Sequence, residues 1–155
     1  MACVPVASSQ PGRSIYQSPL LWATVNVCDT VGHPDAIGIR GSMPGSGRSR
    51  ERMFMRFQVQ YFNAAESLWH NIGPDGDSGF LPAGSARFRV RESGRTFTIM
   101  PPVSGSYLLR GVITFEWRVG DTVVRRARKR TTAGHSRAAA SDPSGFSAAT
   151  CEIRS

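Results

Sequence analysis

The chain has 155 residues, of which 40% are hydrophobic and 9% aromatic, with 19 basic and 11 acidic side chains and a formal net charge of +8. A chain of this size and composition can bury a core of its own, which excludes an intrinsically disordered protein and favours one globular domain. No run of 18 apolar residues occurs, so no membrane-spanning helix is predicted. The positive charge favours attraction to polyanions and says nothing about the fold.

The N-terminal residues 1–19 are rich in serine and proline and are predicted to form a flexible tail. They lack the basic start and the long apolar stretch of a signal peptide. We therefore interpret them as a tail or as the remnant of a leader, and we place the folded domain at residues 20–155.

Most of this domain alternates between apolar and polar residues with a period of two, which is typical of strands with one buried face. In residues 52–62 the odd positions are apolar: Met53, Met55, Phe57, Val59 and Tyr61. The predicted strands cover residues 20–27, 36–43, 52–62, 68–72, 86–91, 96–100, 107–119, 123–132 and 149–153.

Two of these strands have clearly basic outer faces. In residues 86–91 the pattern places Ala86, Phe88 and Val90 inward and points three arginines outward: Arg87, Arg89 and Arg91. In residues 107–119 the predicted inner face consists of Leu109, Ile113, Phe115, Trp117 and Val119. The predicted outer face of that strand consists of Arg110, Thr114, Glu116 and Arg118.

Turn-rich segments separate the predicted strands, and the longest loop covers residues 133–145. Residues 136–141 are the best local helix candidate, but the segment is short and Asp142-Pro143 follows it. We therefore predict an all-β chain that forms a single antiparallel β-sandwich of eight or nine short strands, with little or no helix.

The three cysteines are Cys3, Cys28 and Cys151. Cys28 ends an early apolar run and Cys151 lies in the last one, so we predict a disulfide between them, with Cys3 left over. The alternative is a reduced protein with two buried thiols. A disulfide favours an extracellular or cell-surface location, because such bonds persist in oxidising compartments.

Two segments indicate a family. Residues 60–73, QYFNAAESLWHNIG, place a tryptophan in the second arm of a hairpin, and residues 105–117, GSYLLRGVITFEW, open a long strand with Gly-x-Tyr. They resemble bacterial extracellular immunoglobulin-like or fibronectin-III-like domains, and residues 20–155 also resemble a set of uncharacterised secreted bacterial proteins. The resemblance implies an immunoglobulin-like sandwich and export, and it implies no active site. Tyr107 is interpreted as a core residue or as a tyrosine-corner analogue.

The segment 123–132, VVRRARKRTT, allows two registers against residues 107–119. A two-residue turn would bury Arg126, Arg128 and Arg130 beside Trp117, at a high desolvation cost. A three-residue loop, residues 120–122, instead turns Val123 and Ala127 inward. It also places Arg126 opposite Glu116 and Arg128 opposite Thr114. We favour this second register, in which the heads of Arg125 and Lys129 reach water near a sheet edge.

Several motifs resemble catalytic or metal sites without completing one. Residues 76–79, GDSG, and 132–135, TAGH, resemble serine-protease motifs, but their order is reversed and Phe80 follows the first. Residues 75–79 resemble part of a calcium loop whose twelfth position is Ala86 instead of an acid. His33, His70 and His135 have no metal-binding spacing. We predict no catalytic residue, no metal and no cofactor.

The sequence therefore favours a non-catalytic extracellular or cell-surface module for adhesion, scaffolding or protein binding. The alternative is non-specific binding of an anionic polymer, such as nucleic acid, an envelope phosphate polymer or an acidic glycan. The candidate residues for that alternative are Arg87, Arg89, Arg91, Arg126, Arg128 and Arg130. Aromatic residues interleaved on the basic face would support it, but the alternation predicts that they lie mostly inside.

Overall fold

A computed structural model describes residues 14–155, which form nine β-strands and two 3-10 turns but no α-helix. This confirms the predicted all-β class. Residues 1–13, with Cys3 and most of the predicted tail, lie outside the described residues. The elements are η1 (Ile15–Gln17), β1 (Trp22–Thr30), β2 (His33–Pro44), β3 (Arg52–Asn63), β4 (Leu68–Asn71), η2 (Pro74–Gly76), β5 (Asp77–Ser85), β6 (Val90–Thr98), β7 (Ser106–Val119), β8 (Thr122–Arg130) and β9 (Cys151–Arg154).

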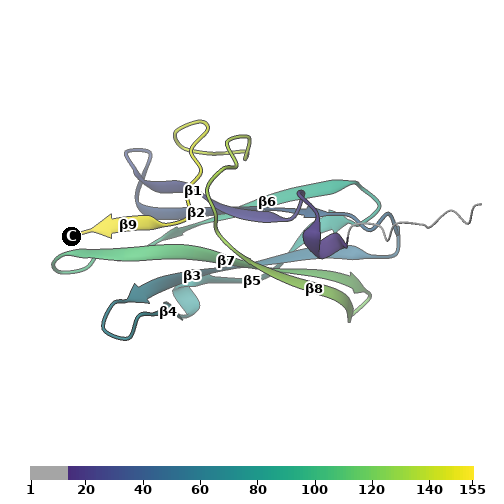
Figure 1. Ribbon diagram of the computed structural model, residues 1–155, viewed down its shortest axis with the longest axis horizontal. Coiled ribbons are helices and arrows are strands. Elements are labelled where there is room, and N and C mark those ends of the chain that lie inside the picture. Colours follow the sequence, from purple (N-terminus) through teal and green to yellow (C-terminus); the bar gives the residue numbers. More distant parts are fainter. Residues whose placement is uncertain (1–13) are drawn as a thin grey trace, which may run out of the picture.

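The strands form two antiparallel sheets that pack face to face as a β-sandwich (Figure 1). The three-stranded sheet has the order β1-β2-β6. The six-stranded sheet follows the path β4-β3-β7-β8, with β5 paired to β3 and β9 paired to β7. None of the helical segments in residues 14–155 is long and apolar enough to cross a membrane.

The core lies between the sheets and confirms most of the predicted inner faces. The side chains of Met53, Met55, Phe57 and Val59 are all fully buried. On β7 the buried residues are Leu109, Ile113, Phe115 and Trp117, and the indole Nε1 of Trp117 donates to the carbonyl of Pro44 at 2.9 Å. Val119 was predicted to lie inside but is 43% exposed, because the strand reaches its turn there.

A disulfide joins Cys28 in β1 to Cys151 in β9, the pair that the sequence predicts. Because β1 belongs to the three-stranded sheet and β9 to the six-stranded sheet, the bond crosses the sandwich. Ile15 of the described N-terminal residues packs against the core close to β1.

The predicted strand at residues 86–91 is wrong. Residues 86–89 form a turn that carries the chain from β5 in one sheet to β6 in the other. Phe88 is 39% exposed, because the guanidinium groups of Arg87 and Arg91 lie 4.7 and 3.9 Å from its ring centroid and hold it at the surface. Strand β5, in contrast, covers a segment that was predicted in part as a turn.

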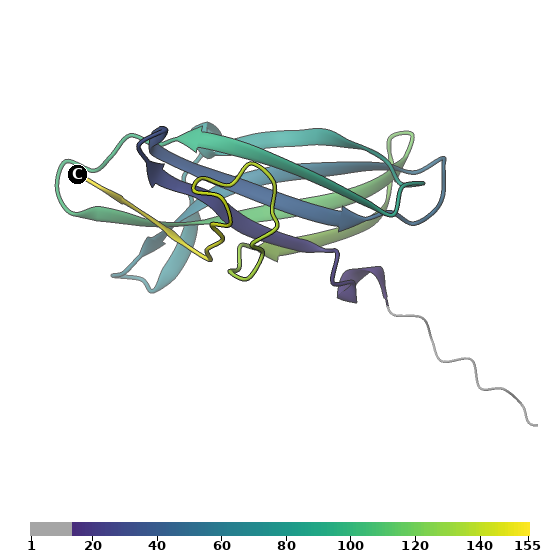
Figure 2. The same ribbon diagram turned by 90° about the horizontal axis from the view of Figure 1, so that it is seen from above.

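The long segment between β8 and β9, residues 131–150, covers the three-stranded sheet and is called the cover loop (Figure 2, yellow-green). Both ends of the loop pair with the edge of β1. At its start the Thr132 amide donates to the Ala23 carbonyl, and near its end Ala148 exchanges two backbone hydrogen bonds of 2.9 and 3.0 Å with Val25. The candidate helix at residues 136–141 is part of this loop.

The middle of the cover loop lies over the outer face of the three-stranded sheet. The side-chain amide of Asn26 donates to the carbonyls of Ala139 and Ala140, both at 3.2 Å. The amide of Ala139 donates to Glu92 Oε1 at 2.7 Å. Since Asn26 belongs to β1 and Glu92 to β6, the loop is tied to both edge strands of that sheet.

Candidate anion-binding face

The outer face of the six-stranded sheet is rich in arginine, and the cover loop lies on the opposite side of the molecule (Figure 1). We call it the basic face. Strand alternation and the pairings place on it Arg52, Phe54, Arg56, Gln58, Gln60, Phe62, Trp69, Asp77, Phe80, Arg110, Val112, Thr114, Glu116, Arg118, Arg126, Arg128, Arg130, Glu152 and Arg154.

The register that presents the β8 arginines agrees with the prediction. Arg126 lies opposite Glu116, and Arg128 lies opposite Thr114. The predicted three-residue loop is wrong, because Val119 pairs with Thr122 around a two-residue turn. A bulge after that turn absorbs one further residue and restores the register.

The same bulge changes the two valines at the start of β8. Val123 was predicted to face the core, but it is 38% exposed, and Val124 is 44% exposed. Ala127 packs against the core as predicted. The bulge therefore allows Arg126 and Arg128 to face solvent while the turn stays short.

Glu116 lies at the centre of the basic face and is only 1% exposed. Arg118 Nη2 donates to Glu116 Oε1 at 2.7 Å, and Arg126 Nε donates to Oε2 at 2.6 Å. Burial alone would raise the pKa of Glu116, but the hydrogen bonds and charges of these two arginines outweigh it and lower the pKa below its usual value. Glu116 is therefore a carboxylate that neutralises part of the face.

Aromatic rings alternate with the arginines on this face, which corrects the expectation that they lie mostly inside. The guanidinium of Arg118 is 4.1 Å from the ring centroid of Phe54 and 4.7 Å from that of Phe80. The guanidinium of Arg56 lies 5.9 Å from the ring centroid of Phe80, and the Nε of Arg56 donates to Asp77 Oδ1 at 2.9 Å. That hydrogen bond lowers the pKa of Asp77. The rings are thus partly covered by cations.

Arg110 has a different environment from the arginines around Glu116. Its guanidinium lies 4.4 Å from the ring centroid of Trp69, and its Nε donates to Gln60 Oε1 at 2.9 Å. Burial lowers the pKa of Arg110, and the charges of Arg130 and Arg128 lower it further. Positive charge is therefore concentrated at this end of the face.

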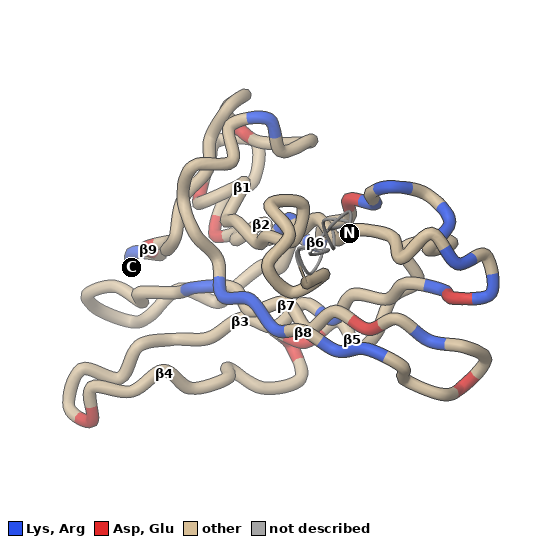
Figure 3. Tube along the Cα trace, turned by 45° about the vertical axis from the view of Figure 1, so that its right-hand side comes forward, with Lys and Arg blue, Asp and Glu red and all other residues tan. Residues whose placement is uncertain are grey.

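Arg110, Arg128 and Arg130 form what we call the arginine triad. Within residues 14–155, no carboxylate lies within ion-pair distance of any of the three. Figure 3 shows the basic residues as a run along β8 beside β7. Three neighbouring cations that lack an acidic partner are the arrangement that an anionic ligand would stabilise.

Arg125 has a buried partner that the sequence did not indicate. It was expected to extend its head to water near an edge, but it forms an ion pair with Glu51, which is 2% exposed. Burial alone would raise the pKa of Glu51; hydrogen bonds from Ser46 and Arg125 outweigh it and lower the pKa. Arg125 is thus part of the structure of the sandwich and is not available to a ligand.

The candidate arginines at residues 87–91 do not join the basic face. Arg87 and Arg89 lie in the turn between β5 and β6, and Arg91 lies near the start of β6. The Nε atom of Arg91 is buried without a hydrogen-bond partner in the described residues, while its guanidinium stacks on Phe88. The six candidate arginines therefore form two separate groups.

The residues of the motifs that resemble catalytic sites make contacts within the fold. Ser78 of the GDSG segment accepts a hydrogen bond from the amide of Phe57 in the six-stranded sheet. His135 of the TAGH segment stacks on Trp22 of the other sheet, with ring centroids 4.5 Å apart. Burial lowers the pKa of His135. Within residues 14–155, no three His, Cys, Asp or Glu side chains are arranged to hold a metal ion.

No profile of a protein family matches the sequence. No curated protein matches it either. Among solved structures, the chain is similar to Bifidobacterium dentium beta-glucuronidase complexed with coumarin-3-O-glucuronide, with 13% sequence identity and a TM-score of 0.38 over 74% of this chain and 18% of that chain. This chain therefore corresponds to less than a fifth of the length of that enzyme.

Proposed function

We propose that this chain is a non-catalytic β-sandwich module that acts outside the cell or at the cell surface and binds an anionic polymer through its basic face. The observation that carries the proposal is the arginine triad, three adjacent arginines without a carboxylate partner in the described residues. Keeping like charges together has an electrostatic cost, which the phosphates, sulfates or carboxylates of a ligand would remove.

A polymer fits this surface better than a single anion. The basic face continues from the triad along β7 and β8 to Arg126 and Arg118, whose charges exceed the single charge of Glu116 between them. Trp69 and Phe62, 5.2 Å apart, add a ring pair at the edge of the face. Rings beside cations suit a chain of charged units that carry flat or apolar groups.

The extracellular part of the proposal is supported by the Cys28–Cys151 disulfide, because such bonds persist mainly in oxidising compartments. The non-catalytic part is supported by the separation of the two motifs that resemble a protease. Ser78 belongs to the six-stranded sheet, whereas His135 packs on a residue of the three-stranded sheet. A nucleophile and its base must lie within hydrogen-bonding reach of each other.

A second candidate function is protein binding, the role that the sequence alone favoured. The observation in its favour is a set of exposed apolar side chains in the loops at one end of the sandwich. Val31 in the β1–β2 turn is fully exposed, and so is Val103 in the β6–β7 loop, while Met100 is 86% exposed. Exposed apolar residues at one end are common in surfaces that contact a protein.

Binding at several salt concentrations tests the proposed function. Heparin, long-chain polyphosphate and two unrelated duplex DNAs serve as probes, and the logarithm of affinity should fall linearly with the logarithm of salt concentration. The two DNAs should bind alike, because phosphate contacts carry no sequence information. A strong preference for one DNA sequence, or an affinity that salt does not change, contradicts the proposal.

The matched variants locate the site. Replacing Arg110, Arg128 and Arg130 by glutamine should weaken binding and reduce the salt slope by about three. The control replaces Arg50, Arg95 and Arg137, three exposed arginines outside the basic face, and changes the net charge equally. Equal losses in both variants would show that only net charge matters and that the triad is not a site.

A further inference from the structure

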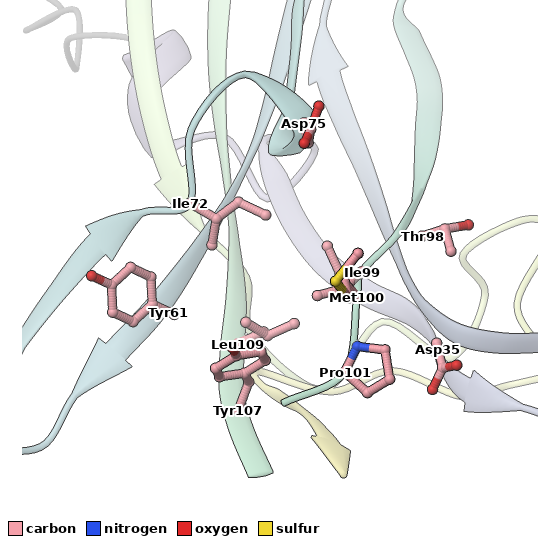
Figure 4. A pocket seen from close by; sticks show the side chains of 10 residues that line it. All are labelled: Asp35, Tyr61, Ile72, Asp75, Thr98, Ile99, Met100, Pro101, Tyr107 and Leu109. Carbon is pink, nitrogen blue, oxygen red and sulfur yellow. The ribbon is translucent and has the colours of Figure 1, made fainter. Parts of the chain in front are cut away.

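A cavity of about 980 Å³ opens at one end of the sandwich, where side chains from both sheets meet. Figure 4 shows that its walls come from the ends of β2, β3, β6 and β7 and from the connections beside them. Cavities of this volume are in the range that holds small organic ligands. This cavity is distinct from the basic face, because it is lined by inward-facing residues of β3 and β7, such as Tyr61 and Leu109.

The floor and walls of the cavity are apolar and aromatic. Ile99 and Leu109 are buried core residues whose side chains reach the cavity, and Ile72 is packed against the same core. Tyr61 and Tyr107 add two phenol rings, of which Tyr107 is 40% exposed. Such a lining takes an apolar or aromatic group out of water.

The charged residues of the lining are both acidic, although the chain carries a net charge of +8. They are Asp35 and Asp75, and Figure 4 places them on opposite sides of the cavity. No arginine, lysine or histidine lines the cavity, and neither carboxylate forms an ion pair within residues 14–155. The cavity is therefore a negative site in a positive molecule.

The backbone of Asp35 is held in place from both sides. Its amide donates to Asp29 Oδ1 at 2.8 Å, and its carbonyl accepts from the amide of Ile99 at 2.7 Å. Its φ of +53° is in the left-handed region, which aspartate tolerates better than most residues. The backbone that carries this carboxylate is thus fixed before any ligand arrives, which lowers the entropy cost of binding.

We infer that this cavity binds an organic cation, a compact apolar or aromatic group that carries an ammonium or guanidinium. The apolar floor accommodates the hydrophobic part of such a ligand. The carboxylates and the faces of the tyrosine rings attract its charge. A metal ion is a poor match, because the two carboxylates lie on opposite sides and cannot converge on one centre. The inference is independent of polymer binding by the basic face.

Three probes of similar shape and different charge test this inference: phenethylammonium, 2-phenylethanol and phenylacetate. Titrations are followed by the NMR signals of the methyl groups of Ile99, Met100 and Leu109. We expect the ammonium probe to bind about tenfold more tightly than the alcohol, and phenylacetate to bind more weakly than both. Equal affinities for the ammonium and the alcohol, or no shifts at these methyl groups, overturn the inference.

Charge-neutral variants then identify the residues. In D35N/D75N the affinity for phenethylammonium should fall to that for 2-phenylethanol, while the affinity for the alcohol itself stays unchanged. The control is D121N, which removes an acid in the β7–β8 turn, away from the cavity. Wild-type affinity in D35N/D75N, or an equal loss in D121N, overturns the inference. The unfolding midpoint of each variant, measured in parallel, shows that the fold is retained.

Discussion

The outer faces of the two sheets are both polar, yet they are used differently. On the three-stranded sheet the cover loop contacts Thr24 and Asn26, which are at most 5% exposed, and the one arginine beside them, Arg40, is paired with Glu92. On the six-stranded sheet the corresponding positions hold arginines, and the cover loop lies on the other side. An outward-facing polar side chain therefore contributes to the structure where the cover loop supplies its hydrogen-bond partner. Where no loop covers it, the side chain stays available to a ligand.

Outward-facing side chains are covered in different ways on the two faces. Beneath the cover loop, side-chain polar atoms pair with loop backbone, as the amide of Asn26 does with two carbonyls. On the basic face, long arginine side chains take over the covering role: Val112 is only 3% exposed although it points outward. The stems of arginines bury apolar surface while their charged heads remain at the surface.

The largest change to this arrangement should come from removing the bond between the two sheets. Replacing Cys28 and Cys151 together by serine opens a loop with a sequence separation of 123. In the chain-entropy model this lowers the free energy of unfolding by about 4–5 kcal/mol. Urea unfolding of the oxidised wild type and of the variant measures the difference. An unchanged midpoint would contradict the prediction and show that the bond adds nothing to the packing of the core between the sheets.

A smaller loss should follow when the buried charge of the basic face is removed. Glu116→Gln weakens three hydrogen bonds from Arg118 and Arg126 and should lower the free energy of unfolding by about 1.5–3 kcal/mol at neutral pH. The control is Glu152→Gln, a change at an exposed acid, which should cost less than about 0.5 kcal/mol. Similar losses in both variants would mean that Glu116 does not stabilise the face.

The same substitution has a pH signature. The folded pKa of Glu116 lies below its usual value of 4.5, so the unfolded chain binds more protons when the pH falls. The stabilisation is therefore complete above about pH 4.5 and is lost as the pH falls through the folded pKa. Glu116→Gln should reduce the acid sensitivity of unfolding, measured from about pH 7 to about pH 3. Part of the acid sensitivity will remain in this variant, because the pKa values of Asp77 and Glu51 are lowered too.

The smallest of these effects compares single polar side chains on the two outer faces. Asn26→Ala removes the donor to Ala139 and Ala140 beneath the cover loop and should cost about 1–3 kcal/mol. Thr114→Ala on the basic face should change the free energy of unfolding by less than about 0.5 kcal/mol. Equal costs measured by urea unfolding would mean that the cover loop does not make the polar side chains beneath it more important for stability than those of the basic face.

The sequence predicted most strands, including the short strands β4 and β9, but it misplaced the strands around the β5–β6 turn. In residues 52–62 and 107–119 the alternation extends over many positions, and only one choice of inner face buries the apolar residues. Residues 86–91 alternate as well, but Phe88 is stabilised at the surface by its arginine neighbours. Alternation in six residues therefore does not distinguish a buried strand from a turn with stacked side chains.

The candidate site was predictable in part. The β7–β8 register followed from the cost of burying arginines, which is a local argument and agreed with the structure. The rings on the basic face had a signal too, because Phe54 and Phe62 occupy even positions of the strand at residues 52–62. No signal in the sequence indicated the Arg125–Glu51 pair, because the partners are 74 residues apart and meet only where β8 packs beside the residue that precedes β3.

The backbone pairing between Val25 and Ala148 has a consequence for association between molecules. An edge strand normally leaves a row of amides and carbonyls unpaired, to which a foreign strand can add. Here the cover loop occupies those groups on β1 at Ala23, Val25 and Asn26. Intermolecular sheet growth is therefore blocked along β1. Resistance to amyloid-like assembly at this edge thus depends on residues 131–150 being folded onto the first strand.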